Sequence, residues 1–343
     1  MSACYLLKIN LQKINYSFQC KPTKPNFLIS YPFSTKLHQF HHSSSLFLQP
    51  LSSRTKLSYN FHVHSSISTP SPPLSKDEAI VQAKTCLSAA LEKPLNNPKL
   101  PGKLKKLKQP RLRVEIPIVD DSPSSLSNLA FQVFGDIPIK RKGSAVKVLI
   151  IWSNPILAEA ASKKFDNLSS NLAVENRDLP SVSNNGDSRA LNSSDVVVFM
   201  LPETSELGLV KIVTERAYPK ATVIFNPKWG FEEEGDLKEE KGFVGSFEVV
   251  YSFMGLEVRG LLSKRKGVVF KCARDGIISG ERWNILMEEE GGGGGMEVVS
   301  QLKTRPSIAE VENVLYNVMA INSPITKSAK FLKDMLSNVT GKK

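Results

Sequence analysis

Two short apolar segments constrain the fold of this chain more than any other feature. They are the runs DVVVFMLP at residues 195–202 and ATVIFNPKWG at residues 221–230. Each run is rich in β-branched residues, is apolar at successive positions and reaches a proline where the apolar stretch ends. This pattern is typical of a central strand in a parallel sheet that is buried on both faces. Because such strands need helices on both faces of the sheet, the two runs predict an α/β protein.

Strand and helix patterns alternate around these two runs. The first helix opens at a capping box, Ser75 to Glu78, and is expected to end near Pro94. Further helices are expected at residues 122–134, 154–165 and 207–217, and strands at 111–118, 146–152, 195–201 and 221–225. Strict alternation and a proline place the strand at 111–118 near an edge of the sheet. Residues 167–194 are expected to form a polar loop with a short strand at 171–174.

The pattern changes after Gly230. Short strand signals follow one another without intervening helical periodicity, at residues 243–253, 256–262, 267–272, 282–289 and 296–302. Consecutive strands of this kind predict hairpins. A second capping box at Ser307 then opens a helix. The expected fold is a mostly parallel, Rossmann-like sheet with helices on both faces and an antiparallel C-terminal extension, formed by a single domain over residues 75–321. Residues 322–343 are expected to be a basic C-terminal helix or tail, which holds a membrane surface or a partner's groove, or covers part of the core.

The first 76 residues differ in composition from the rest of the chain. No Asp or Glu occurs before Asp77, whereas this stretch contains fifteen serines and eight basic residues, and only Arg54 among the basic residues is an arginine. A basic, Ser-rich stretch without acidic residues is typical of an organellar transit peptide. The scarcity of arginine favours a plastid, so residues 1–70 are interpreted as a chloroplast transit peptide that is removed. A stromal protein, in peripheral contact with the thylakoid, is the expected result.

Removal of this leader changes what the composition allows. Of the 45 basic side chains 37 lie after residue 76, against 33 acidic ones, so the formal charge falls from +12 for the whole chain to +4 for this part, and bulk charge no longer favours nucleic acid. All five histidines lie before residue 65, which excludes imidazole bases and histidine metal ligands from the rest. Cys86 and Cys272 are too few for a cysteine-only zinc site, and their spacing suggests no redox pair. We therefore expect no metal, no cofactor and no enzymatic activity.

Ligands of open α/β sheets bind at the carboxyl ends of the strands. Residues at these ends, together with an arginine before the last helix, are the candidate ligand or partner contacts: Trp152, Asn154, Glu203, Asn226, Trp229 and Arg305. Asn226 is also an ordinary turn former, and Trp229 also suits closure of the sheet end. No glycine-rich phosphate loop is present, although helix N-termini at Pro155 and Ser307 remain as places for a phosphate. The carboxylates Asp120, Asp121, Asp195 and Glu203 form no evident acid–base pair.

A series of motifs in the chain resembles one plastid and cyanobacterial family. The motifs are VEIPI (114–118), KVLI (147–150), VVVFMLP (196–202), VIFNPKW (223–229), SFEVVYSF (246–253) and TRPS (304–307). They resemble a domain of unknown function that makes up the low photosystem II accumulation 3 proteins of chloroplasts and that also follows the kinase domain of a plastid adenylate kinase. The resemblance covers residues 75–321.

The resemblance implies a non-enzymatic stromal factor that assists assembly or stability of a photosynthetic membrane complex, with photosystem subunits or assembly factors as protein partners. An alternative is a regulatory domain that binds a nucleotide or phosphometabolite, which the doubly wound pattern and the adenylate kinase association favour. A third interpretation is RNA binding through the basic linker at residues 99–113, which lacks interleaved aromatic residues for stacking on bases. Nucleic acid is therefore the least favoured partner.

Overall fold

The computed structural model describes residues 71–96, 108–118, 120–168, 173–184, 188–229, 234, 237, 240–259, 264–289 and 295–321. The predicted leader at 1–70, most of the basic linker and the predicted tail at 322–343 lie outside the described residues. No helix among the described residues combines the length and the apolar character needed to cross a membrane.

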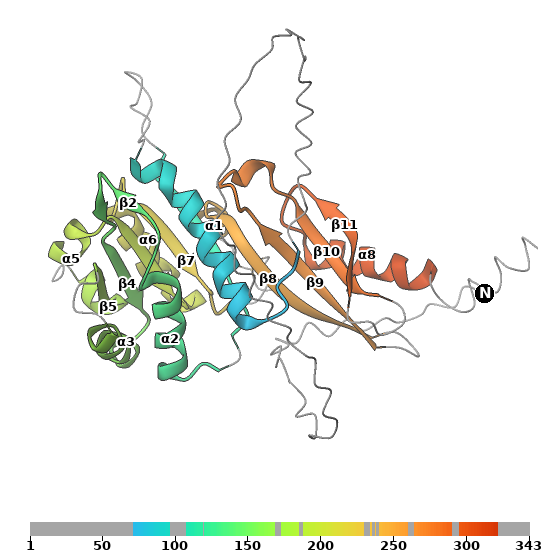
Figure 1. Cartoon of the computed structure of the whole chain (residues 1–343), viewed down its shortest axis with the longest axis horizontal. Helices are drawn as coiled ribbons and strands as arrows, with labels where there is room; N and C mark the ends of the chain where they lie inside the picture. Colours follow the sequence, from blue (N-terminus) through green and yellow to red (C-terminus); the bar gives the residue numbers. More distant parts are fainter. Residues whose placement is uncertain are drawn as a thin grey trace, which may run out of the picture. The chain divides into compact units, whose positions relative to one another are not determined.

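The described residues form a nine-stranded sheet with the order β11-β10-β9-β8-β1-β7-β6-β4-β5 (Figure 1). Its strands are β1 (Arg111–Glu115), β4 (Val148–Trp152), β5 (Val174–Asp178), β6 (Val196–Met200), β7 (Ala221–Phe225), β8 (Glu248–Arg259), β9 (Lys264–Cys272), β10 (Trp283–Glu288) and β11 (Met296–Leu302). Neighbouring strands from β5 to β8 are parallel, and those from β8 to β11 are antiparallel. The predicted mostly parallel sheet with an antiparallel C-terminal part is confirmed.

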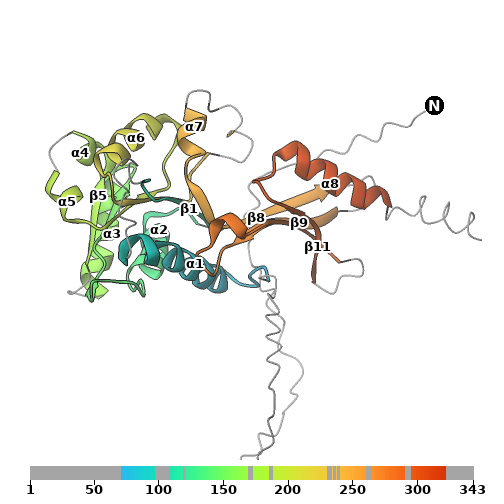
Figure 2. The ribbon, with the colours of Figure 1, turned by 90° about the horizontal axis from the view of Figure 1, so that it is seen from above.

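Helices cover both faces of this sheet. One face carries α1 (Lys76–Asn96), α2 (Pro123–Phe134) and α3 (Pro155–Leu168), and the other carries α4 (Leu179–Ser183), α5 (Ser188–Ser193), α6 (Leu207–Arg216), α7 (Lys241–Val244) and, over the antiparallel strands, α8 (Ile308–Ile321). Figure 2 shows α6, α7 and α8 on the same side of the sheet, with α1 and α2 on the opposite side. A small hairpin of β2 (Lys140–Arg141) and β3 (Ser144–Ala145) and two 3₁₀ turns, η1 (Thr204–Glu206) and η4 (Ile278–Gly280), complete the described elements.

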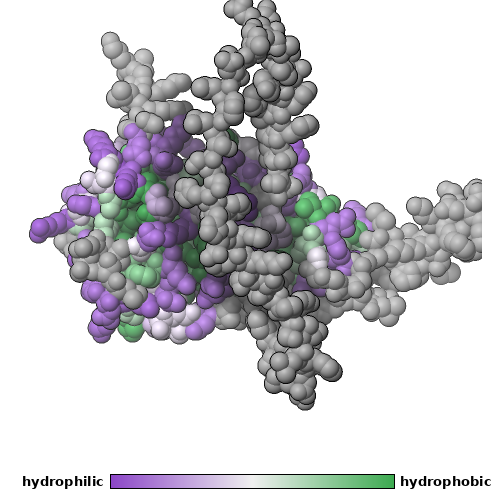
Figure 3. All heavy atoms as spheres, viewed as in Figure 1, coloured by the Kyte–Doolittle hydropathy of each residue, from purple (hydrophilic) through white to green (hydrophobic). Residues whose placement is uncertain are grey.

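The core is split by the sheet because successive side chains of a strand point to opposite faces. In β4, Val148 and Ile150 pack with α1 to α3, whereas Leu149 and Ile151 pack with α4 to α6. A third apolar cluster joins Val269 and Ile285 of the antiparallel strands to α8. In the face that Figure 3 shows, hydrophilic residues predominate on the coloured surface and apolar residues gather in smaller patches.

Three expectations are corrected. The strand at 111–118 is shorter and lies in the middle of the sheet between β7 and β8, not near an edge. Its polar residues Arg113 and Glu115 suggested a solvent-facing side, but both are buried and pair with each other. Within residues 167–194, β5, α4 and α5 replace most of the expected loop. The first strand after Gly230, β8, runs parallel to β1 before the antiparallel hairpins begin.

Candidate functional site

Two of the predicted contact residues at the carboxyl end of β4 have structural roles. Trp152 is fully buried, and its indole Nε1–H donates to Oδ1 of Asn176 at 3.0 Å. The Oδ1 of Asn154 accepts a hydrogen bond from the backbone N–H of Leu157 at 3.0 Å and so caps α3. Both side chains use their polar atoms within the fold, which leaves the end of β4 without an evident ligand contact.

Glu203, after β6, is part of a local pairing. Its carboxylate lies 2.7 Å from Nζ of Lys228, which follows β7, and it also caps the η1 turn. The turns after β6 and β7 are therefore linked by an ion pair at the surface. The backbone N–H of Lys228 also donates to the carbonyl of Pro202 at 2.9 Å, so the two turns are held together independently of this ion pair.

Asn226 and Trp229 lie beside β1. Asn226 has a φ of 48°, and its Oδ1 accepts from the backbone N–H of Ile116 at 2.6 Å, which ties the end of β7 to the end of β1. Trp229 is buried, and the guanidinium of Arg113 lies 5.6 Å from the centre of its ring. Among the described residues, Nδ2 of Asn226 and Nε1 of Trp229 have no hydrogen-bond partner. Buried donors of this kind are rare in native proteins.

Arg305 joins a buried network of charges on β1. Its guanidinium binds both oxygens of Glu115, at 3.1 and 3.2 Å, and lies 3.2 Å from Glu234. Arg113 pairs with Glu115 at 2.6 Å and also with Glu234, and the hydroxyl of Ser252 donates to Glu115 at 2.5 Å. Two arginines thus hold two carboxylates between them, so a carboxylate pair exists that the sequence did not reveal.

Two members of the network, Glu115 and Arg113, are held in their charged forms. Burial alone raises the pKa of Glu115, but Arg113, Arg305 and the Ser252 hydroxyl outweigh it and lower the pKa to about 2. Burial opposes the charge of Arg113 as well, yet Glu115 and Glu234 raise the pKa of its guanidinium above the ordinary value. Glu115 is therefore not placed to exchange a proton near neutral pH, which argues against a role for it in general acid–base chemistry.

A cleft of about 900 Å³ lies next to this network, between α7 and α8 on the face that Figure 2 shows with both helices. We call it the central cleft. Its floor includes Arg113, Val249, Lys271 and Trp283, from four neighbouring strands. The residues that line it are Arg113, Glu234, Leu237, Lys241, Val244, Gly245, Phe247, Glu248, Val249, Lys271, Trp283 and residues 303–308 and 310.

Lys271 distinguishes this cleft from an ordinary hollow. Its side chain is only 7 % exposed, and it makes no hydrogen bond and no ion pair with the residues that the structure describes. Its Nζ lies 5.5 Å from the centre of the Trp283 ring, and the guanidinium of Arg305 lies 5.3 Å from the same ring. Burial lowers the pKa of Lys271, which Glu281 and Glu248 partly offset. A largely buried ammonium without a direct ion pair is costly for a fold, because burial disfavours the charged form.

The chemistry of the cleft fits the binding of an anion. Five basic and three acidic side chains line it, and all three acidic ones are already engaged: Glu234 pairs with Arg113 and Arg305, Glu248 pairs with Lys108, and Glu310 caps α8 at Ser307. The N-terminus of α8 at Ser307 is therefore already capped by a side chain of the same helix. The described residues contain no group of three or more His, Cys, Asp or Glu side chains able to hold a metal.

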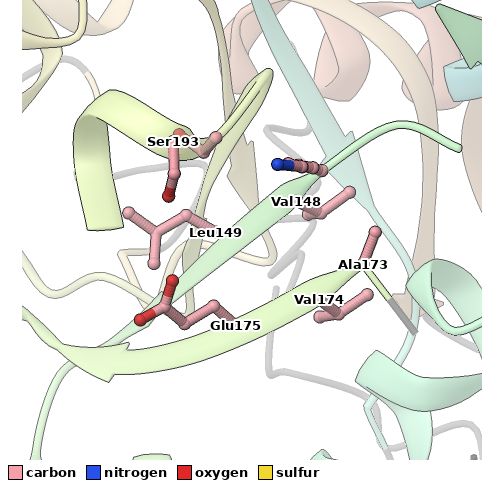
Figure 4. A pocket seen from close by; sticks show the side chains of 8 residues that line it. Val148, Leu149, Ala173, Val174, Glu175 and Ser193 are labelled. Carbon is pink, nitrogen blue, oxygen red and sulfur yellow. The ribbon is translucent and has the colours of Figure 1, made fainter. Parts of the chain in front are cut away.

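A second hollow, of about 270 Å³, lies at the opposite ends of the strands and lacks these properties. Figure 4 shows Leu149 and Glu175, from β4 and β5, below the end of α5 that carries Ser193. Glu175 is already paired with Arg177 at 2.6 Å. The hollow also lies at the amino ends of parallel strands, whereas ligands of such sheets bind at the carboxyl ends.

The sequence predicted Arg305, which lines the cleft, and Trp229, which lies beside the cleft residue Arg113. It also predicted Asn226, which does not line the cleft, and it missed Lys271, Trp283 and Glu115. Arg113 and Glu115 stand two positions apart in an otherwise apolar strand, which places both on one face of the sheet. Two opposite charges on one face of an otherwise apolar strand are the sequence signal for the buried charge network beside the cleft. No sequence pattern distinguishes Lys271, because its lack of an ion pair depends on which distant parts of the chain surround it.

Comparison with known proteins gives a family and no close relatives. One family model, described as a domain of unknown function (DUF1995), matches residues 73–313, which is more than half of the chain. No curated protein and no solved structure matches the chain. The matched segment contains every residue named above for the central cleft.

Proposed function

From the premise that the chain belongs to the DUF1995 family, and from the geometry of the central cleft, we propose that it is a binding protein without catalytic activity that holds an anionic ligand in this cleft. The family description names no activity, so the proposal rests on the cleft. The observation that carries it is Lys271, which is only 7 % exposed and whose ammonium lies over the Trp283 ring without an ion pair to the described residues. A ligand carboxylate or phosphate supplies the direct ion pair that Glu248 and Glu281 do not.

The size and the walls of the cleft favour a small acid with an apolar or aromatic part. Ligand cavities are commonly about 300 to 1,000 Å³, and the central cleft falls in this range. Val244, Phe247 and Val249 supply apolar wall beside the cationic floor. A nucleotide or another phosphometabolite combines these two parts, so the cleft supports best a regulatory domain that binds such a molecule.

The test measures binding of adenosine monophosphate and of inorganic phosphate by calorimetry. The variants are Lys271→Met, which keeps the length of the side chain without its charge, and Lys266→Met, which removes an exposed lysine from the same strand. We expect the Lys271 variant to lose binding by at least tenfold and the Lys266 variant to keep it. Equal affinity in both variants, or no heat with either probe up to 10 mM for the unmodified chain, contradicts the proposal.

A second candidate is the assembly or stabilisation of a photosynthetic membrane complex. The acid-free, Ser-rich leader and the motif series from VEIPI to TRPS support it, and in this case the cleft receives an acidic side chain of a protein partner. Fractionation of chloroplasts and affinity purification of the tagged chain test this role. Photosystem subunits that co-purify with the unmodified chain but not with the Lys271 variant are the expected result. A monomer confined to the stroma, without such partners, argues against it.

A further inference from the structure

Two cysteines that are 186 positions apart in the chain face each other between α1 and the sheet. Cys86, on α1, and Cys272, at the end of β9, place their Sγ atoms 3.4 Å apart. Both side chains are fully buried and both are free thiols. Their distance in the sequence hid the pair, because redox motifs are found by close spacing.

The contact requires little movement to become a bond. A disulfide has an S–S distance of about 2.05 Å, so the two sulfurs need to approach by about 1.4 Å. The apolar surroundings of two buried thiols alone would make both unreactive. Here Arg274 adds a nearby cation, whose charge lowers the pKa of both thiols.

The two thiols share one hydrogen bond, and either sulfur can be its donor. This hydrogen bond and burial raise the pKa of Cys86, whereas the same hydrogen bond lowers the pKa of Cys272 against burial, and Arg274 adds to the lowering. Because the thiolate is the nucleophile in disulfide exchange, the thiol that loses its proton first is the attacking sulfur and the other is the resolving one.

We propose that Cys86 and Cys272 form a reversible disulfide that ties α1 to β9. The oxidant is a low-molecular-weight disulfide such as oxidised glutathione. One of the two protein thiols, as its thiolate, attacks one sulfur of this disulfide, the S–S bond of the oxidant breaks and one glutathione thiolate leaves. The other protein thiol loses its proton and attacks the protein sulfur of the mixed disulfide, which releases the second glutathione thiolate. Two protein thiols are oxidised, one small disulfide is reduced to two thiols, and two protons pass to the leaving thiolates.

The proposed disulfide lies next to the central cleft, and its formation does not depend on ligand binding there. Lys271 immediately precedes Cys272, and its side chain points to the cleft face while Cys272 points to α1. Across the ladder, Cys272 is paired with Tyr251 and Lys271 with Ser252, which holds Glu115. The disulfide therefore restrains the end of β9 that carries the cleft lysine.

The experiment uses the full chain with Cys4→Ser and Cys20→Ser, so that only the two buried thiols remain of four cysteines. The folded chain, and in parallel the chain refolded from urea, is equilibrated with oxidised and reduced glutathione, trapped with N-ethylmaleimide and analysed by mass spectrometry. The refolded sample removes the effect of limited access to buried thiols. We expect a peptide that joins residue 86 to residue 272 and a rise in Tm of about 5 °C or more that dithiothreitol reverses.

The single variants Cys86→Ser and Cys272→Ser are the controls, and each is expected to give no joined peptide and no rise in Tm. If the refolded chain keeps two labelled thiols, or carries separate glutathione adducts, in excess oxidised glutathione, the inference is wrong. Neither result depends on whether the cleft binds an anion.

Discussion

At the scale of single residues, Glu115 is the carboxylate whose ionisation the fold most depends on. Its pKa in the folded chain is lowered to about 2 from an ordinary 4.5. A lowered carboxylate pKa gives stability that is complete above the unfolded pKa and is lost as the pH falls toward the folded one. We therefore expect a loss on the order of 3 kcal/mol between pH 4.5 and pH 2 from this group.

Glu115→Gln tests this expectation. Urea unfolding at stepwise pH should show a free energy of unfolding that is several kcal/mol lower at pH 7, since Arg113 and Arg305 lose a buried partner, and a shallower decline below pH 4.5. Glu159→Gln, at an exposed pair on α3, is the control and should leave the pH profile unchanged. An unaltered decline in the Glu115 variant would show that the loss of stability in acid has another origin.

Lys271 lowers the stability of the fold at neutral pH, whereas Glu115 raises it. Its lowered pKa means that the folded state disfavours the charged form, so its cost to stability is present at neutral pH and diminishes as the pH rises toward 10.5. Lys271→Met should raise the free energy of unfolding at pH 7 by about 1 kcal/mol while it removes anion binding. Urea unfolding at pH 7, with Lys266→Met as the control, measures this. A destabilised Lys271 variant would indicate that the ammonium has a structural role.

At the scale of elements, the turn after β9 presses against α1. Gly276 has a φ of 67°, and a Cβ at this position would lie 2.5 Å from the carbonyl oxygen of Ala89. Gly276→Ala is expected to cost about 2 kcal/mol, from the unfavourable φ and from displacement of α1. Gly208→Ala is the matched control, because Gly208 lies in α6 with open space around it and should be neutral or stabilising by up to about 1 kcal/mol. Urea unfolding of both variants checks this, and equal effects would contradict the close packing.

The elements also show what local sequence determines. The apolar runs of β4, β6 and β7, the Ser122 cap of α2 and the capping box of α8 carry their own signals, and the structure has each element where it was expected. The central position of β1 has no such local signal. Its two charged residues suggest a solvent-exposed face, and only the fold brings Glu234 and Arg305 to them from other parts of the chain. The short segments β5, α4 and α5 contain too few periodic residues to stand out from a loop.

At the scale of the whole domain, the sheet changes from parallel to antiparallel at β8, and the central cleft spans this change. Arg113 comes from the parallel part, whereas Lys271, Trp283 and Arg305 belong to the antiparallel part or to the segment before α8. The sequence predicted the two parts of the sheet but not their order in space. The cleft depends on that order, because β1 is inserted between β7 and β8 and so places Arg113 next to β8, whose other neighbour is β9.

A ligand in the cleft should therefore stabilise both parts of the sheet at once. Binding to the folded state raises its stability by about 2.7 kcal/mol at a ligand concentration of 100 Kd, and amides exchange hydrogen more slowly where opening breaks ligand contacts. With saturating adenosine monophosphate, we expect slower exchange in β1, in β9 and at residues 303–310 together, but not in β5 or α3 at the far edge. Hydrogen exchange with mass spectrometry of the unmodified chain and of the Lys271→Met variant measures this, and the variant should show no protection. Slower exchange confined to β4, β6 and β7 would instead place the ligand at the strand ends near Trp152 and Glu203.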